Sequence, residues 1–271
     1  MRKRNKHNAF IFILAIFLFL VLYLVYSFYK TKENLDLNDS EQDVSRDDVQ
    51  LVIARYNEDL KWINDDPYKK YKNIIYNKSD NSDFSTSEKT TDVVSLPNVG
   101  RCDHTYLYHI IHNYDNLANI TVFLTGSLNL DHKKNKSTRL LNEIDSNKRN
   151  VFLCSKYENV QKELYDFQLD GWKSSDEKNS VLNSEDKLDS AKIRPFGKWF
   201  SDKFDDLKIE YVSYYGIFSV NKKEILQHPK SHYENLIKDL ETSSNPEAGH
   251  FFERAWVAVF HPMSETKFIQ E

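Results

Sequence analysis

Short apolar runs alternate with polar and amphipathic segments along most of the chain. Four runs are rich in β-branched or aromatic residues and are bounded by polar positions, which is typical of buried strands. They cover residues 50–55 (QLVIAR), 73–77 (NIIYN), 120–125 (ITVFLT) and 151–154 (VFLC). Residues 216–220 form a further, shorter candidate.

Amphipathic segments between these runs predict helices. Asp103 can cap a helix whose apolar positions share one face: Tyr106, Leu107, Ile110, Ile111 and Tyr114. Further helices are expected over 58–63 and 230–240, and from Asn245-Pro246-Glu247 onward. Polar residues 79–92 predict a loop, and 171–194 a flexible surface excursion. Strands separated by helices predict an α/β fold with a mainly parallel sheet flanked by helices.

The amino-terminal pattern is different, because residues 9–29 (AFIFILAIFLFLVLYLVYSFY) carry no charge. About 20 apolar residues suffice to span a bilayer as a helix, and a cleaved signal peptide has a shorter apolar region ending in small residues. We therefore expect a single-pass signal anchor. Arg2, Lys3, Arg4 and Lys6 precede the span, which predicts a cytosolic amino terminus and a luminal or extracellular carboxyl-terminal domain.

These patterns predict five regions. They are a basic cytosolic tail (1–8), the transmembrane anchor (9–29), an acidic stalk (30–49), a folded domain (50–262) and a carboxyl-terminal tail (263–271). A type II membrane protein of this kind is expected in the Golgi or the endoplasmic reticulum in preference to the plasma membrane.

Composition excludes several classes of protein. The 37 Lys and Arg against 41 Asp and Glu give a net charge of −4, so no basic excess indicates a nucleic-acid partner. Two cysteines, Cys102 and Cys154, are too few for a disulfide scaffold. They can form one bridge in an oxidising lumen or stay as two thiols. A GxSxG elbow, a P-loop and an HExxH motif are all missing from the sequence.

The first candidate site follows the first strand. Arg55, Asn57 and Glu58 lie where open α/β sheets bind ligands, beyond the carboxyl end of a strand. Arg55 can hold a phosphate and Asn57 a base or ribose. Alternatively, Asn57 caps the next helix and Arg55 pairs with a surface carboxylate.

The second candidate site precedes the helix at Asp103. Gly100 and Arg101 stand just before a helix amino terminus, where free N–H groups favour an anion, and His104 is close to them. A structural histidine is the alternative for His104.

The third candidate site lies on the last predicted helix. His250 and Glu253 share a face away from the apolar stripe, and a carboxylate there can take a proton from a substrate hydroxyl. The alternative is that Glu253 and Arg254 pair with other groups to hold the helix in place.

Several segments together resemble a known family. They are VIARYNEDLKWI (52–63), IIYNK (74–78), LPNVGRCDHTYLYHIIHNYDNLANITVFLTGS (96–127), Asp131-His132, YGIFSVNKKEILQHPKSHYENL (215–236) and NPEAGHFFERAWVAVF (245–260). The chain resembles a domain-of-unknown-function family, with fungal, viral and bacterial members, that is grouped with GT-A glycosyltransferases. The resemblance covers residues 52–260.

The resemblance implies a GT-A-like fold that binds a nucleotide sugar, with Arg55, Asn57 and Glu58 at the nucleotide end. It places Asp131 and His132 where such enzymes bind Mn²⁺ or Mg²⁺ through a DxD motif, which this chain lacks in a clean form. It also implies that Glu253 is the base, with Arg254 and His250 beside it. Cys102 and Thr125 depart from the family pattern.

The expected function is transfer of a sugar from a nucleotide-sugar donor to a luminal or surface glycan or glycoprotein. The alternative is a catalytically inactive glycan-binding or scaffold protein on the same fold. In that case Trp62, Trp172 and Trp199 are candidates to stack on sugar rings.

Overall fold

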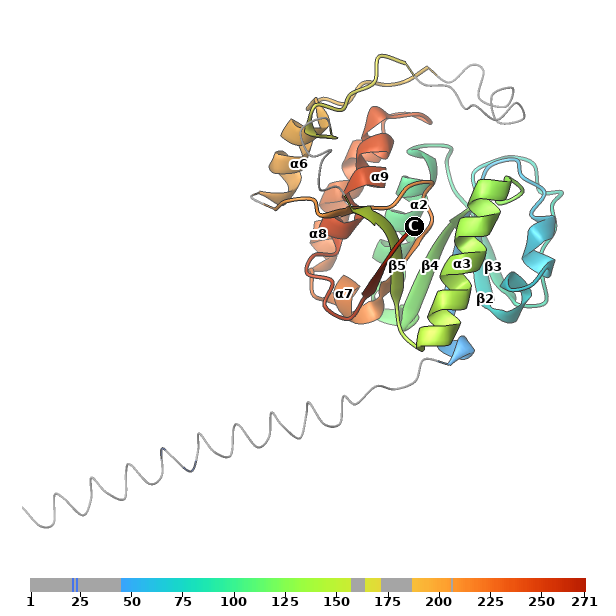
Figure 1. Ribbon diagram of the computed structural model, residues 1–271. Helices are drawn as coiled ribbons and strands as arrows, with labels where there is room; N and C mark the ends of the chain where they lie inside the picture. Colours follow the sequence, from blue (N-terminus) through green and yellow to red (C-terminus); the bar gives the residue numbers. More distant parts are fainter. Residues whose placement is uncertain (1–20, 22, 24–44, 157–163, 172–186, 206) are drawn as a thin grey trace, which may run out of the picture. The chain divides into compact units, whose positions relative to one another are not determined.

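The apolar runs form the strands of a mainly parallel sheet (Figure 1). The computed structural model describes residues 21, 23, 45–156, 164–171, 187–205 and 207–271. The described strands are β1 (Val49–Arg55), β2 (Lys72–Asn77), β3 (Thr90–Ser95), β4 (Ile120–Thr125), β5 (Val151–Lys156), β6 (Tyr211–Val212), β7 (Phe218–Asn221) and β8 (Lys267–Gln270). The described α-helices are α2 (Arg101–His112), α3 (Asp131–Asn147), α6 (Phe196–Phe204), α7 (Lys222–Leu226), α8 (Lys230–Leu236) and α9 (Glu247–Val259).

Five strands form the central sheet in the order β3-β2-β1-β4-β7. The first four are parallel and β7 runs antiparallel to β4. A smaller sheet has the order β6-β5-β8, in which β5 and β8 are parallel. The predicted α/β class with a mainly parallel sheet flanked by helices is therefore confirmed.

Helices cover both faces of the central sheet, which is why β1 is a continuous apolar run. On one face, Leu51 and Ile53 of β1 share a buried cluster with Leu140 and Ile144 of α3. On the opposite face, Val52 belongs to a larger cluster with residues of α2, α6, α8 and α9. Successive side chains of a strand point to opposite faces, so the central part of β1, Leu51 to Ala54, is apolar at every position.

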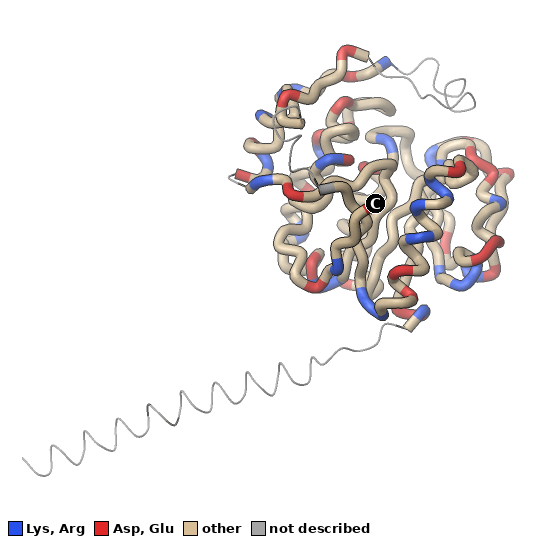
Figure 2. Tube along the Cα trace, in the orientation of Figure 1, with Lys and Arg blue, Asp and Glu red and all other residues tan. Residues whose placement is uncertain are grey.

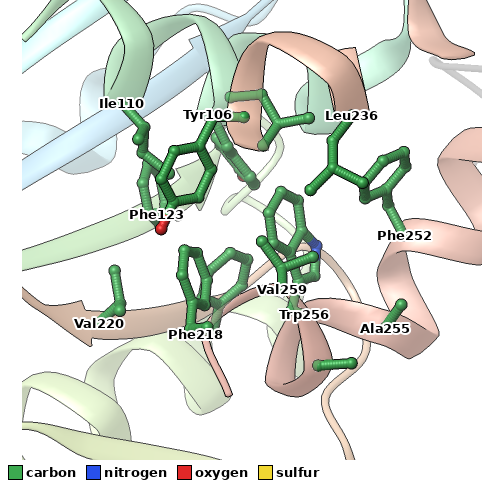
Figure 3. Packing of buried hydrophobic residues seen from close by; sticks show 14 of the residues in the cluster. Tyr106, Ile110, Phe123, Phe218, Val220, Leu236, Phe252, Ala255, Trp256 and Val259 are labelled. Atoms are coloured by element: carbon green, nitrogen blue, oxygen red, sulfur yellow. The ribbon is translucent and has the colours of Figure 1, made fainter. Parts of the chain in front are cut away.

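Aromatic side chains fill the larger cluster. Trp256 of α9 packs on Phe218 of β7 with 4.8 Å between ring centroids, and Tyr106 of α2 lies 4.7 Å from Phe123 of β4 (Figure 3). Residues from four elements meet here, so this cluster joins α2 and α9 to the sheet. The two helices also carry the second and third candidate sites.

Several predicted boundaries were wrong. The helix expected to be capped by Asp103 begins three residues earlier, because Gly100 is the N-cap in a left-handed conformation. The segment 58–63 forms only a 3₁₀ turn, Lys61–Asn64. The helix expected over 230–240 becomes a 3₁₀ turn after Leu236. The strand expected from residue 216 begins at Phe218.

Other elements carry too weak a local signal to be predicted. The end of the expected loop 79–92 already belongs to β3, an exposed edge strand that pairs with β2. Helix α3 is strongly polar and buries only a narrow stripe of residues. Residues 267–270, expected in a carboxyl-terminal tail, form β8 against β5.

The predicted excursion 171–194 is described only in part, because 172–186 lie outside the described residues. Its last part is held in place by Glu247 of α9, whose side chain is fully buried. One Glu247 oxygen accepts the Ala191 N–H at 2.9 Å and the other lies 3.2 Å from Arg194. A buried carboxylate therefore anchors the end of this segment to α9, while its predicted flexibility stays a prediction.

The predicted anchor 9–29 also lies outside the described residues, apart from Val21 and Tyr23. Within the part of the chain that the structure describes, no helix is long and apolar enough to cross a membrane.

Candidate functional site

The carboxyl ends of β1 and β4 lie side by side at the point where the strand order of the sheet diverges. Strand β1 pairs with β2 on one side and with β4 on the other, and Ala54 is opposite Thr125. The N–H of Gly126 donates to the Ala54 carbonyl at 2.7 Å. Open α/β sheets bind ligands beyond such a point. The loops after β1 and β4 are therefore the first place to look for a site.

Glu58 is fixed at this edge of the sheet. Its Oε2 accepts the N–H of Tyr56 at 2.7 Å. The carboxylate also lies directly against Gly126, where an added Cβ would come within 2.8 Å of Oε2. The indole N–H of Trp62 donates to the carbonyl of the same glycine at 2.9 Å. Gly126 therefore permits close contact between the two loops.

Lys133 lies in the first turn of α3, next to these loops. Its Nζ donates to the Ser127 hydroxyl at 2.7 Å. Burial lowers the pKa of Lys133, while the nearby Cys102 and Glu58 act in the opposite direction. Sequence analysis missed this residue. The signal that it overlooked is the concentration of cations in the first half of α3, seen as blue segments in Figure 2: Lys133, Lys134, Lys136 and Arg139.

Arg55 is part of the fold and is not exposed to a ligand. Its side chain is 1% exposed and stacks on Phe84 at 3.9 Å. The guanidinium donates to four oxygens in the loops after β1 and β2: the carbonyls of Tyr56, Glu58 and Asn81 and the Oδ1 of Asn77. The expected partner, a surface carboxylate, is replaced by neutral loop oxygens.

Asn57 is partly buried and is likewise engaged within the loops. Its Oδ1 accepts the Ser79 hydroxyl at 2.6 Å. It does not cap a helix, because Leu60 is the residue before the 3₁₀ turn. The predicted helix cap by Asn57 and the predicted surface carboxylate for Arg55 are therefore wrong, whereas a base or ribose contact by Asn57 stays a prediction.

Gly100 is required for packing. Its φ is +59°, and an added Cβ would lie 2.5 Å from the Leu240 carbonyl oxygen. Its N–H donates to the Ser243 carbonyl at 2.8 Å, so this N–H is not available to an anion. His104, one turn further on, is 4% exposed, and burial lowers its pKa to about 4. Its Nδ1 is buried without a hydrogen-bond partner among the described residues, and the choice between a ligand residue and a structural histidine stays a prediction.

Arg101 and His250 come together from α2 and α9. Arg101 Nη1 lies 3.1 Å from Asn245 Oδ1 and 3.4 Å from His250 Nε2. Burial, together with the charges of Arg101 and Arg254, lowers the pKa of His250 to about 2. A neutral His250 presents a lone pair to Arg101, so it positions the arginine and does not carry a proton at neutral pH.

We expect acid to destabilise the protein through His250. Between about pH 7.5 and 5.5 the unfolded imidazole takes up a proton as its pKa of 6.5 is passed, whereas the folded imidazole stays neutral. The loss is about 1.4 kcal/mol of unfolding free energy per pH unit below 6.5. Urea denaturation at both pH values checks this: His250→Asn should lose roughly 1 kcal/mol less than the wild type. The exposed His112→Asn is the control, and an equal loss in all three proteins would contradict the expectation.

Asp103 is a buried carboxyl next to this pair. It is 3% exposed, and its Oδ1 accepts the indole N–H of Trp256 at 3.1 Å. Burial and then the charge of Glu253 raise the pKa of Asp103 to about 7, although the charge of Arg101 acts in the opposite direction. The negative charge of Glu253 therefore affects the protonation of Asp103 in the first turn of α2.

Glu253 is the acid of the third candidate site, and its side chain is 25% exposed. Its Oε1 accepts the N–H of Tyr215 at 2.7 Å. Tyr215 has a φ of 72°, which is strained for a residue with a Cβ, and it is 45% exposed. Its ring lies 4.9 Å from that of His132. Strained backbone and an exposed ring beside a fixed carboxylate are features of functional sites.

Arg254 contacts its own helix and an aromatic ring outside it. Its Nη1 donates to the His250 carbonyl at 2.7 Å and lies 3.6 Å from Glu253 Oε2. The guanidinium also stacks on Phe167 at 3.6 Å. These contacts agree with the structural alternative for Arg254.

Asp131 and His132 are exposed in the first turn of α3. No group of three or more His, Cys, Asp or Glu that could hold a metal ion is found among the described residues. Among the described residues, Asp131 and His132 are therefore not joined by a third side chain of this kind. The metal role implied by the resemblance stays a prediction.

The two cysteines are free thiols. Cys154 lies in β5, where its Sγ is 3.6 Å from the Ile269 carbonyl oxygen. Cys102 lies in α2, and its Sγ is next to Gly216. An added Cβ on Gly216 would come within 2.8 Å of Cys102 Sγ, and burial raises the pKa of this thiol. The second of the two possibilities left open by the sequence is the one observed.

The structure thus combines parts of the second and third candidate sites and adds residues that sequence analysis missed. Arg101 meets His250, and Glu253 meets Tyr215, which contacts His132. Lys133 and Tyr215 are the additions. Trp62 and Trp199 are 5% and 2% exposed and cannot stack on a sugar, while Trp172 lies outside the described residues.

Comparison with known proteins gives a family for this chain. A comparison with curated proteins finds no match. The model of the family described as "Protein of unknown function (DUF3431)" matches residues 51–268, which include every described strand except part of β1 and of β8. This match confirms the predicted domain-of-unknown-function family. The chain belongs to the DUF3431 family.

Proposed function

We propose that the protein is a glycosyltransferase-like enzyme that transfers a sugar from a nucleotide-sugar donor to a glycan acceptor. One observation carries the proposal. A fixed, partly exposed carboxylate, Glu253, accepts the N–H of Tyr215, whose neighbour Gly216 packs against Thr125 at the carboxyl end of β4, and Lys133 binds Ser127 just beyond the same strand end. A base and a cation in one place suit transfer from a phosphate leaving group.

The donor is proposed to bind over the ends of β1 and β4. The four parallel strands have the order β3-β2-β1-β4, in which the chain crosses over β2 and β1 between β3 and β4. This strand order is common to nucleotide-binding α/β folds and is compatible with a GT-A-like fold. Gly126 lets the loops after β1 and β4 approach closely, and Lys133 adds a positive charge beside them.

The acceptor is proposed to bind on the side of Tyr215. Its exposed ring offers a surface for a sugar, and its N–H orients Glu253. Glu253 takes the proton of the acceptor hydroxyl, whose oxygen then forms a bond to the anomeric carbon of the donor. The bond between that carbon and the phosphate oxygen breaks, and the nucleoside diphosphate leaves with its electron pair.

The proposed setting is a luminal or surface compartment. An anchor over residues 9–29 would hold the domain at the membrane with its amino terminus in the cytosol. A Golgi or endoplasmic reticulum location suits a glycan acceptor.

Thermal unfolding against a panel of nucleotide sugars tests the proposal. A ligand that binds only the native state at 100 times its Kd stabilises by about 2.7 kcal/mol, which for a chain of this size is a rise in Tm of roughly 5–10 °C. We expect such a rise with one nucleotide sugar and none with the free sugar. A rise with a glycan alone, and with no nucleotide sugar, would favour the inactive glycan-binding alternative instead.

A further inference from the structure

Three lysines of α3 lie within one turn of each other but have different surroundings. Lys134 forms an ion pair with Asp65 at 3.1 Å, and Lys136 forms one with Glu271 at 2.8 Å. Lys133 has no carboxylate within ion-pair distance among the described residues, and its hydrogen-bond partner is the neutral Ser127 hydroxyl. Arg139 also lacks such a carboxylate among the described residues, but it is exposed and donates to the Gln270 carbonyl, so Lys133 is the partly buried cation of this helix without an ion-pair partner.

The environment makes this charge unfavourable without a ligand. Lys133 is partly buried, and the desolvation of an ammonium group is costly unless an anion compensates it. The position in the helix adds to the cost. The first turn of a helix has a positive dipole, so cations there are disfavoured, yet the cations of α3 gather in its first half, where Asp131 is the one acid, and Glu143 and Asp145 lie in its second half (Figure 2).

The location indicates which anion would compensate the charge. Lys133 is next to Ser127 in the loop after β4, at the edge of the sheet where the donor is proposed to bind. A diphosphate placed there would meet the ammonium and the amino-terminal end of α3. The described residues offer no cluster of ligands for a divalent cation at this place.

We infer that Lys133 binds the diphosphate of the donor and supplies positive charge that does not depend on a protein-held metal ion. The inference rests on the proposed function. It assigns Lys133 as a donor-binding residue, whereas Lys134 and Lys136 hold α3 to neighbouring segments.

Titration calorimetry with inorganic pyrophosphate in EDTA tests the assignment on the full-length chain. We expect binding to the wild type and to Lys134→Met, and binding at least about tenfold weaker to Lys133→Met, because a charge-assisted contact is lost. No binding to the wild type in EDTA, or equal binding to Lys133→Met, would overturn the inference.

A second measurement uses the wild type alone and so does not depend on how a variant folds. Pyrophosphate should slow the reaction of Lys133 with an amine-acylating reagent, followed by mass spectrometry, and leave Lys134 unchanged as an internal control. Equal protection of both lysines, or of neither, would count against the site.

These outcomes separate the inference from the proposed function. If a nucleotide sugar stabilises Lys133→Met as much as the wild type, the donor binds elsewhere and only the inference fails. If pyrophosphate binds through Lys133 but no nucleotide sugar raises Tm, the anion site stands and the transferase proposal fails.

Discussion

Glu253→Gln is expected to lower turnover of the proposed transfer by about 10²- to 10⁴-fold, because an amide cannot accept the proton of the acceptor hydroxyl. Stability should change little, since the amide oxygen can still accept the Tyr215 N–H that now binds Oε1. Turnover is measured as release of the nucleoside diphosphate, using the donor identified by thermal unfolding.

Glu234→Gln is the matched control, because Glu234 is exposed on α8. Unchanged turnover in Glu253→Gln would remove Glu253 as the base. A large fall in Tm would show that the Tyr215 contact is chiefly structural. A loss of turnover with an unchanged Tm and an unchanged donor response is the outcome that supports catalysis.

Arg55→Met is expected to lower the free energy of unfolding by about 3–5 kcal/mol, because four buried or partly buried oxygens lose a charged donor at once. For a chain of this size the fall in Tm is roughly 6–20 °C. Urea denaturation measures the first quantity and thermal unfolding the second.

Arg139→Met is the control, since Arg139 is exposed and donates to the Gln270 carbonyl at 2.9 Å. Its expected loss is below about 1 kcal/mol. If Arg55→Met instead keeps its stability and loses only the response to nucleotide sugar, then Arg55 binds donor and the interpretation of its contacts is wrong.

The family was predicted correctly from the sequence because long motifs stay recognisable without a structure. The chemical roles within those motifs were harder to predict. Arg55 follows a strand and carries a charge, which equally suits a phosphate ligand and a loop anchor. Only its four oxygen partners and its 1% exposure distinguish the two. Lys133 was missed for the opposite reason, since a lysine in a polar helix is normally a surface residue.

Sequence alone determined the strands β1, β2, β4 and β5 and the helices α2 and α9. Each of these elements buries so much apolar surface that its sequence shows a clear hydrophobic pattern. The pattern is a continuous apolar run in a strand covered on both faces, or one apolar stripe on a helix. These elements set the α/β class, and the motifs within them set the family.

Only the tertiary structure decided where polar segments go and which charged residues meet. The edge strand β3, the polar helix α3 and the terminal strand β8 acquire their structure by packing against neighbours distant in sequence. The same holds for the contacts of Arg101 with His250 and of Glu253 with Tyr215. The physical reason is that local patterns report which residues are buried, whereas the partners of a charge depend on how the chain brings separate loops together.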